Sequence, residues 1–260
     1  MASKTEVYIA GVGLSPAPSA GSSAKPYITY MVSAATKALL DTGVTFDDVT
    51  RSVTSSNRNT LKHGLKVSQA FYEGNIPVDE VESGAELESS FSLIKDQGAP
   101  CVLMVAIEKT SAVAFVLVSD DFLWSRPYLK DSAARLRQSD RPKSGSQENR
   151  ELDSLCQAVW SLRGWTDTKG KAAKSAFSYQ SSTTTFELSR ADSKSIPEWK
   201  DVQYKQDGKH RLGYNPATED REISYEDFEA VCAVRKRNST QKDWNHFRRK
   251  DGDRAALARL

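Results

Sequence analysis

The sequence predicts a layered α/β protein, and three observations predict it. Two runs, 101–107 (CVLMVAI) and 111–119 (SAVAFVLVS), are apolar at successive positions, which is typical of strands that helices cover on both faces. A short β-rich run at 6–14 precedes a segment with helical spacing at 27–43. Strands and helices alternate on both sides of a polar stretch at 139–151, as they do in layered α/β domains.

The first predicted strand runs from Val7 to Val12, and a loop of small, turn-forming residues follows it. The helix expected next has its apolar residues near helical spacing, and Gly43 supplies its end; these residues are Ile28, Met31, Val32, Ala35, Leu39 and Leu40. Thr45 with Asp48 three residues later resembles a capping box on a short turn.

A second strand is predicted at 51–56 (RSVTSS). Residues 61–99 are expected to be weakly helical, with Gly98 as a helix end. The segment 120–138 is a short amphipathic stretch.

In the second half, residues 152–165 and 166–177 are expected to be helical, residues 181–189 form a strand, and a final strand lies around Ala230 to Val234. These elements give four parts: an N-terminal half at 1–138, a linker at 139–151, a C-terminal half at 152–238 and a basic tail at 239–260.

Composition excludes several classes. A net charge of +2 over 260 residues argues against a nucleic-acid binder, and no apolar run has the ~20 residues that a membrane span needs. The tail interleaves basic residues with Trp244 and Phe247, as stacking surfaces for nucleic acid do. A solvated or targeting tail is favoured because no nucleic-acid-binding motif accompanies it. The N-terminus lacks the apolar core of a secretory signal.

The three cysteines, Cys101, Cys156 and Cys232, are far apart and form neither a metal-binding pair nor a disulfide framework. Buried, unreactive thiols in a reducing, intracellular compartment fit this pattern. No metal site and no resident cofactor are predicted.

Several patches, in order along the chain, resemble the thiolase superfamily, most closely the sterol-carrier-linked peroxisomal thiolases. These patches are VYIAGVGLSP, AATKALLDTGVTFDDVTRSV, GAPCVLMVAIEKT, AVAFVLVSDDFLWSRPYLK and AVCAVRKR. The resemblance covers about half of the chain. It implies a thiolase-like α/β/α fold with two topologically similar halves, shortened mainly after Thr110, and a homodimer that forms through a sheet edge.

The chain departs from the family at the catalytic motifs. Where the family carries Asn-Cys-Ser-x-Gly, this chain has DEVESGAELESS at 79–90, which places the nucleophile position near Glu80 or Val81 without a cysteine. Glu187-Leu188-Ser189-Arg190 stands where the family has Glu-Leu-His-Asp. The family's Gly-His-Pro-Leu-Gly falls on Lys209-His210-Arg211-Leu212-Gly213.

The resemblance therefore implies a site without its nucleophile, and thiolase chemistry needs one. His210 is the candidate that remains, with Glu80 and Glu82 for acid–base work and Lys209, Arg211, Gly213 and Ser189 as candidate substrate-binding residues. Glu80, Glu82, Glu86 and Glu88 form an acidic cluster. This cluster is either a solvated face or a source of a catalytic carboxyl group.

Two functions follow from the resemblance. One is a biosynthetic enzyme that isomerises or cyclises an acyl- or polyketide-derived small molecule without a covalent intermediate, with a CoA thioester as substrate or ligand. The other is a catalytically inactive homologue that binds acyl-CoA or a partner. The terminal Ala258-Arg259-Leu260 resembles the Ser-Lys-Leu address and so suggests peroxisomal import.

Overall fold

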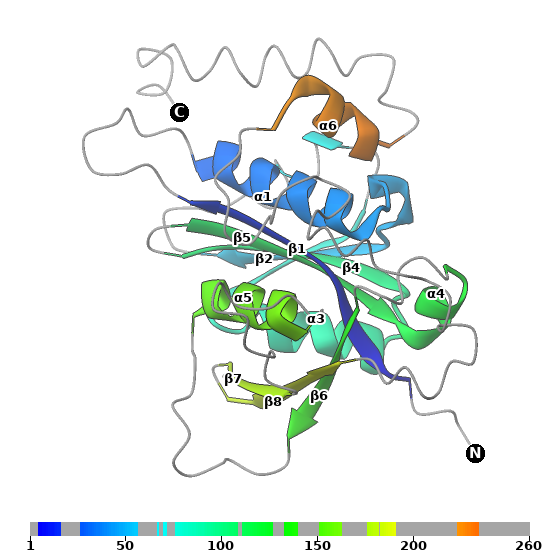
Figure 1. Ribbon diagram of the computed structural model, residues 1–260, viewed down its shortest axis with the longest axis vertical. Coiled ribbons are helices and arrows are strands. Elements are labelled where there is room, and N and C mark those ends of the chain that lie inside the picture. Colours follow the sequence, from blue (N-terminus) through cyan, green and yellow to red (C-terminus); the bar gives the residue numbers. More distant parts are fainter. Residues whose placement is uncertain are drawn as a thin grey trace.

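The chain forms one sheet with helices packed on both of its faces (Figure 1). The computed structural model describes residues 5–16, 27–56, 67, 70–71, 76–108, 111–126, 133–139, 151–162, 176–181, 183–190 and 223–233. The layered α/β class that the sequence predicts is confirmed by this arrangement.

Within the residues just given, the sheet has eight strands in the order β3-β2-β4-β5-β1-β6-β8-β7. Strand β2 is parallel to both of its neighbours, β3 and β4, whereas all other adjacent pairs are antiparallel. The strands are β1 (Val7–Pro16), β2 (Arg51–Ser56), β3 (Val78–Glu82), β4 (Cys101–Ile107), β5 (Ser111–Ser119), β6 (Ala134–Ser139), β7 (Ala176–Gln180) and β8 (Thr185–Arg190).

Helices α1 (Tyr27–Thr42) and α6 (Tyr225–Val231) cover one face of the sheet, and α3 (Glu86–Lys95) and α5 (Leu152–Leu162) cover the other (Figure 1). The sheet curls, so that α3 and α5 lie between the central strands and an arm formed by β6, β8 and β7. We call these three strands the β6–β8–β7 arm. Two short elements, the 3-10 turn Phe46–Asp48 and helix α4 (Asp120–Trp124), complete the described structure.

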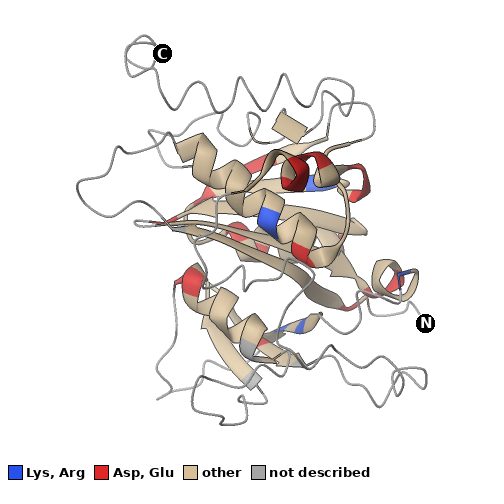
Figure 2. Cartoon of the chain, turned by 45° about the horizontal axis from the view of Figure 1, so that its top comes forward, with Lys and Arg blue, Asp and Glu red and all other residues tan. Residues whose placement is uncertain are grey.

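The apolar core has two parts, one on each face of the sheet. Alternate residues of β4 supply them, with Val102 and Met104 on the α3/α5 side and Cys101 and Leu103 on the α1 side. This double burial explains why β4 and β5 are apolar at every position. Accordingly, β1, β4 and β5 contain no charged residue, and most of the sheet is tan in Figure 2.

Helix α1 packs unusually close to β1, and two glycines permit it. A Cβ atom on Gly11 would lie 2.3 Å from the carbonyl oxygen of Ala38, and a Cβ atom on Gly13 would lie 2.1 Å from that of Ala34. Neither distance is compatible with a larger side chain. The register of β1 against β5 also shifts between Ile9 and Gly11, which is a β-bulge at the point of closest contact.

Most of the predicted elements of the first half are confirmed. Gly43 and Gly98 end α1 and α3 with φ angles of 73° and 71°, in the left-handed region that glycine adopts readily. The capping box is also present, since the Thr45 N–H donates to the Asp48 carboxylate over 3.1 Å.

The strand predicted around Ala230 to Val234 is wrong for the residues of that range that the structure describes, because Ala230 and Val231 end helix α6 and Cys232 caps it. Ser224 and Asp227 form a capping box, in which the Asp227 N–H donates to the Ser224 hydroxyl over 3.1 Å and the Ser224 N–H donates to the Asp227 carboxylate over 3.0 Å. Phe228, Val231 and Cys232, at helical spacing, are buried on the α1 side of the core. The capping box and the helical spacing of the buried residues favour a helix more strongly than the short apolar run favours a strand.

The weakly helical assignment of 61–99 is wrong for Val78–Glu82, which is strand β3. Pairing with β2 supplies its backbone hydrogen bonds, and only Val81 reaches the core. The segment 120–138, expected as one amphipathic stretch, contains α4 and then β6. Strand β7 lies partly within the range 166–177 that was expected to be helical.

Strands of both predicted halves join the same sheet, because β8, from the C-terminal half, pairs with β6, which lies almost entirely in the N-terminal half. Residues 140–150 of the expected linker and the whole tail at 239–260 lie outside the described residues. The domain boundaries and the similarity between the two halves therefore stay predictions. Among the described helices, none combines the length and apolar character that a membrane-spanning helix requires.

Candidate functional site

Polar residues gather where three parallel strands end. Strands β3, β2 and β4 run in the same direction, so their carboxyl ends meet at one edge, where open α/β sheets usually bind ligands. Ser55 lies near the end of β2, Gly84 and Glu86 follow β3, and Glu108 follows β4. The Ser55 hydroxyl accepts a hydrogen bond from the Ile107 N–H over 3.1 Å, which ties the ends of β2 and β4 together.

Glu86 is the central residue of this edge. Its side chain is at the first turn of α3 and the residue is only 2% exposed. The carboxylate accepts a hydrogen bond from the Gly84 N–H over 2.8 Å. Burial raises the pKa of Glu86, and hydrogen bonds from the backbone of Glu86 and Gly84 and from the Ser55 hydroxyl oppose the rise. The result is a buried carboxyl group that holds its proton more tightly than usual.

We call Ser55, Gly84, Glu86, Tyr179 and Ser181 the α3 N-terminal cluster. The Tyr179 phenol, from β7, is buried. Burial raises its pKa, and the charges of Glu86 and then Glu108 raise it further. Tyr179 therefore stays a neutral hydroxyl group at all ordinary pH values.

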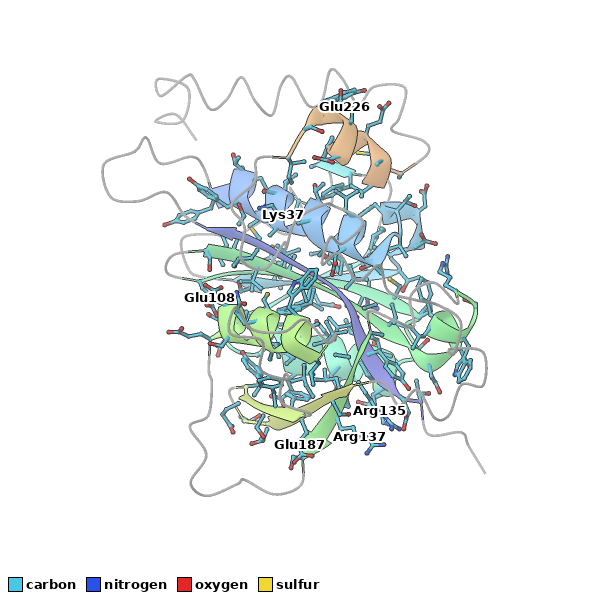
Figure 3. All side chains as sticks on the ribbon, viewed as in Figure 1. Lys37, Glu108, Arg135, Arg137, Glu187 and Glu226 are labelled. Carbon is cyan, nitrogen blue, oxygen red and sulfur yellow. The ribbon has the colours of Figure 1, made fainter. Side chains whose placement is uncertain are left out.

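A second, partly buried carboxyl group is that of Glu108, which follows β4. Glu108 accepts a hydrogen bond from the Leu152 N–H at the start of α5 over 2.6 Å, and Figure 3 shows it beside that helix. Burial raises the pKa of Glu108, and the nearby carboxylates of Asp153 and Glu151 raise it further. Asp153 is itself held by the Ser111 hydroxyl, which donates to it over 2.7 Å.

The turn between β7 and β8 is fastened to the start of α3. The Ser181 hydroxyl donates to the Gly84 carbonyl over 2.6 Å. The hydroxyls of Thr183 and Thr184 both donate to the Glu88 carboxylate, over 2.9 Å and 2.8 Å. The turn thus lies against the same helix end that carries Glu86.

The acidic cluster of the sequence separates in the structure. Glu80 and Glu82 are exposed on β3, an edge strand of the sheet, whereas Glu86 is buried. Ser189 lies on β8 opposite Arg135 of β6, at the far end of β8 from the Ser181–Thr184 turn. The structure therefore does not bring Glu80, Glu82 and Ser189 together with the α3 N-terminal cluster.

His210, Lys209, Arg211 and Gly213 lie outside the described residues, and their assignment stays a prediction. Ser55, Tyr179 and Glu108 were not singled out from the sequence as site residues. A usable signal existed for Glu86, because Glu86, Ser90 and Leu93 repeat at helical spacing and are all buried. In the described part of the chain, no group of three or more His, Cys, Asp or Glu side chains is arranged to hold a metal ion.

No family model matches the chain, and no curated protein matches it. Among solved structures, the chain is similar to the priming β-ketosynthase from the R1128 polyketide biosynthetic pathway, with 17% identity and a TM-score of 0.38 over 44% of this chain and 50% of that one.

The chain is also similar to 3-oxoacyl-[acyl-carrier-protein] synthase III from Aquifex aeolicus VF5, with 16% identity and a TM-score of 0.39 over 62% of this chain and 73% of that one. A third similarity is to a fungal type III polyketide synthase, with 12% identity and a TM-score of 0.39 over 64% of this chain and 75% of that one. The chain spans about half of the β-ketosynthase's length. All three are synthases by name, and the similarity concerns the arrangement of strands and helices over part of each chain.

Proposed function

We propose that this protein is a shortened, thiolase-like biosynthetic enzyme in which a carboxyl group acts in place of a cysteine nucleophile. It would move a proton on an acyl- or polyketide-derived substrate, in an isomerisation or cyclisation that forms no covalent intermediate. The observation that carries the proposal is the buried Glu86 carboxyl group at the start of α3.

The position of Glu86 supports the proposal. The resemblance places the family's nucleophile near Glu80 or Val81, on β3, and Glu86 follows a few positions later, after the turn at Gly84, at the beginning of α3. No cysteine lies within 79–90, and Cys101, Cys156 and Cys232 are buried in other elements. Glu86 supplies the only buried titratable side chain among the described residues of that segment.

The chemistry of Glu86 also supports the proposal. A carboxyl group with a raised pKa can be protonated nearer neutral pH than a solvated one, so it can both give and take a proton during turnover. The hydrogen bond from the Gly84 N–H fixes one carboxylate oxygen. Tyr179, whose pKa the charge of Glu86 raises, supplies a neutral hydroxyl group that could hold a carbonyl oxygen as negative charge develops there.

Access to Glu86 sets a requirement. The residue is almost completely buried, and the Ser181–Thr184 turn is fastened to the same helix end. Substrate binding must therefore displace this turn. The contacts given for it are hydrogen bonds from its hydroxyl groups to the Gly84 carbonyl and the Glu88 carboxylate.

The test is proton exchange at carbon in deuterated buffer. Acetyl-CoA is incubated with the protein, and loss of the methyl proton signal is followed by NMR. In the proposed reaction a carboxylate removes a proton from the methyl carbon, the resulting carboxyl group exchanges this proton for a deuteron of the solvent, and the deuteron is then returned to the same carbon. Wild type should accelerate this exchange, and Glu86→Gln should abolish the acceleration.

Glu80→Gln and Glu82→Gln are the matched controls, because they make the same change on the exposed edge strand. If either of these variants lost the acceleration of proton exchange while Glu86→Gln kept it, the proton-transferring group would be on β3. That result would overturn the role of Glu86. His210→Ala tests the remaining candidate from the family motif, and substitutions of Lys209, Arg211 and Ser189 test substrate binding through changes in KM.

A second candidate function has its own support. The hydrogen bonds from Gly84 and Ser55 to Glu86 are those of a structural group at a helix start, which fits an inactive homologue that only binds acyl-CoA. CoA, acetyl-CoA and acetoacetyl-CoA should then raise the melting temperature without proton exchange. A ligand at 100 times its Kd stabilises a protein by about 2.7 kcal/mol, which a melting curve resolves readily.

Two further points belong to the proposal. A homodimer through the β3 edge would place the exposed Glu80 and Glu82 of two copies close together, and such charges oppose edge pairing. Sedimentation at low and high salt tests whether the dimer forms.

Peroxisomal import through Ala258-Arg259-Leu260 predicts that a fluorescent fusion loses its punctate location when Leu260 is removed.

A further inference from the structure

A cleft of about 600 Å³ lies at the opposite end of α3 from Glu86. Helix α3 has ten residues, so its ends are about 14 Å apart. The cleft is formed where the start of β1, the end of α3 and strand β6 meet, and its volume is in the range of small-molecule sites. Its charged lining residues are Glu6, Lys95, Asp96, Arg135 and Arg137.

Two arginines of β6 converge on one carboxylate in this cleft. Arg135 forms an ion pair with the Oε1 oxygen of Glu6, and a guanidinium nitrogen of Arg137 lies 3.7 Å from the same oxygen. The Tyr8 hydroxyl donates to the other oxygen, Oε2, over 3.1 Å. Figure 3 shows the two arginines next to each other beside the beginning of β1.

The arrangement is a carboxylate-recognition site that the chain's own Glu6 occupies. Guanidinium groups present planar pairs of donors that match a carboxylate, and they stay charged at all pH values of interest. The Arg135 side chain is 20% exposed, whereas that of Arg137 is 58% exposed. The less exposed guanidinium is the preorganised one, and the more exposed guanidinium can turn toward an incoming anion.

The rest of the lining favours an organic anion. Phe91, Val7 and Leu136 supply apolar surface, and Ser92 and Gln138 supply hydrogen-bonding groups. An inorganic anion has no apolar surface that could pack against these side chains. Lys95, whose ammonium group donates to the Thr5 carbonyl over 2.5 Å, adds a third cation at the rim.

We propose that this cleft binds a small organic carboxylate, whose carboxylate group takes the place of Glu6 between Arg135 and Arg137 while its apolar part rests against Phe91. Glu6 then acts as an internal competitor for the site. This inference does not rest on the acid–base function proposed for Glu86, because the two sites use different residues at opposite ends of α3.

Competition by Glu6 gives an unusual prediction. Glu6→Gln removes the resident carboxylate and should lower the Kd for benzoate about tenfold. A hydrogen bond to a charged group changes an affinity by about this factor. Arg137→Gln should weaken benzoate binding about tenfold for the same reason. Binding is measured by calorimetric titration of the full chain with benzoate, with benzamide as the uncharged analogue.

Asp96→Asn is the matched control for Glu6→Gln, because it removes an exposed carboxylate from the same cleft without touching the arginine pair. Arg126→Gln is the control for Arg137→Gln, since Arg126 pairs with Asp48 outside the cleft. Both controls should bind benzoate like wild type. Circular dichroism melting of each variant shows that it is folded at the temperature of the titration.

Three outcomes would overturn the proposal. In the first, Glu6→Gln binds benzoate no more tightly than Asp96→Asn does. In the second, the protein binds benzamide as tightly as benzoate. In the third, it binds inorganic phosphate more tightly than benzoate. None of these results bears on proton exchange by Glu86, so failure of either proposal can be recognised separately.

Discussion

The carboxylate of Asp41 accepts a hydrogen bond from the backbone N–H of Val12 over 2.8 Å. One helical turn earlier, the Lys37 ammonium group donates to the Leu14 carbonyl over 2.9 Å. Both side chains belong to α1 and are buried, Asp41 at 2% and Lys37 at 0% exposure. They bind β1 just after its bulge, so α1 and β1 are joined by polar contacts as well as by close packing.

Asp41→Ala should lower the free energy of unfolding by about 1–3 kcal/mol, because it leaves the buried Val12 N–H without its acceptor. Urea denaturation measures the change. Asp47→Ala, at an exposed position in the turn after α1, is the control and should change stability by less than about 0.5 kcal/mol. Equal effects of the two substitutions would show that the Asp41 contact contributes little.

Gly11→Ala should prevent stable folding. The added Cβ would lie 1.8 Å from the Thr42 hydroxyl oxygen and 2.3 Å from the Ala38 carbonyl oxygen, so α1 would have to move away from β1. Gly98→Ala is the comparison for backbone strain alone, because the φ of Gly98 is 71°, which is unfavourable for alanine, and nothing lies within 4 Å of the new atom. It should cost only about 1–2 kcal/mol.

The stability of the protein should fall as pH rises from the acid range. The ordinary pKa of a glutamate is 4.5, and burial raises the pKa of Glu86 in the folded protein. Between the two pKa values the folded protein holds a proton that the unfolded chain has released. The stabilisation from this proton is complete below pH 4.5 and is lost as pH rises through the folded-state pKa.

Glu86→Gln removes this titration, so the fall in stability above pH 4.5 should become shallower in denaturation curves measured pH by pH. Part of the fall should persist in the variant, because the pKa of Glu108 is raised in the same direction. A profile identical to that of wild type would mean that the pKa of Glu86 is the same in the folded and unfolded chain.

The native protein should show no rapidly reacting thiol. All three cysteines are buried, and burial raises the pKa of Cys101 well above its usual value, which suppresses the reactive thiolate. An aromatic disulfide reagent should therefore label the protein only as fast as it unfolds, and should label all three cysteines in denaturant. One fast-reacting thiol in the native protein would restore a cysteine nucleophile and contradict the proposed chemistry.

The sequence predicted the central strands and α1 well because local signals and tertiary packing agree there. Strands β4 and β5 are apolar at every position since both of their faces are buried, and Gly43 and Gly98 stop helices for a reason of backbone conformation alone. Helix α6 was missed because Ala230 to Val234 is an apolar run of strand-like appearance. Its identity as a helix depends on the Ser224–Asp227 cap and on the surface of α1.

The candidate site was only partly predictable for a different reason. Sequence spacing identified the acidic segment containing Glu80, Glu82 and Glu86 but could not separate its members, because their burial depends on elements from elsewhere in the chain. Glu86 is covered by a turn almost a hundred positions later, through Ser181. The contact between Glu6 and the arginine pair of β6 also joins residues that are far apart in the sequence, so spacing could not predict it.

The joint between β1 and the β6–β8–β7 arm has only three residue pairs, Val7 to Ile9 with Ala134 to Leu136, whereas β1 and β5 share nine. The arm is instead held by side chains on α3 and α5, such as the ring of Phe91, whose centre lies 5.3 Å from that of Phe186. In a hydrogen-exchange experiment the arm should therefore open as a separate cooperative unit, while β2, β4, β5 and β1 keep their amide protons. We therefore expect a molecule whose strands form one hydrogen-bonded sheet but whose resistance to unfolding divides it into two units.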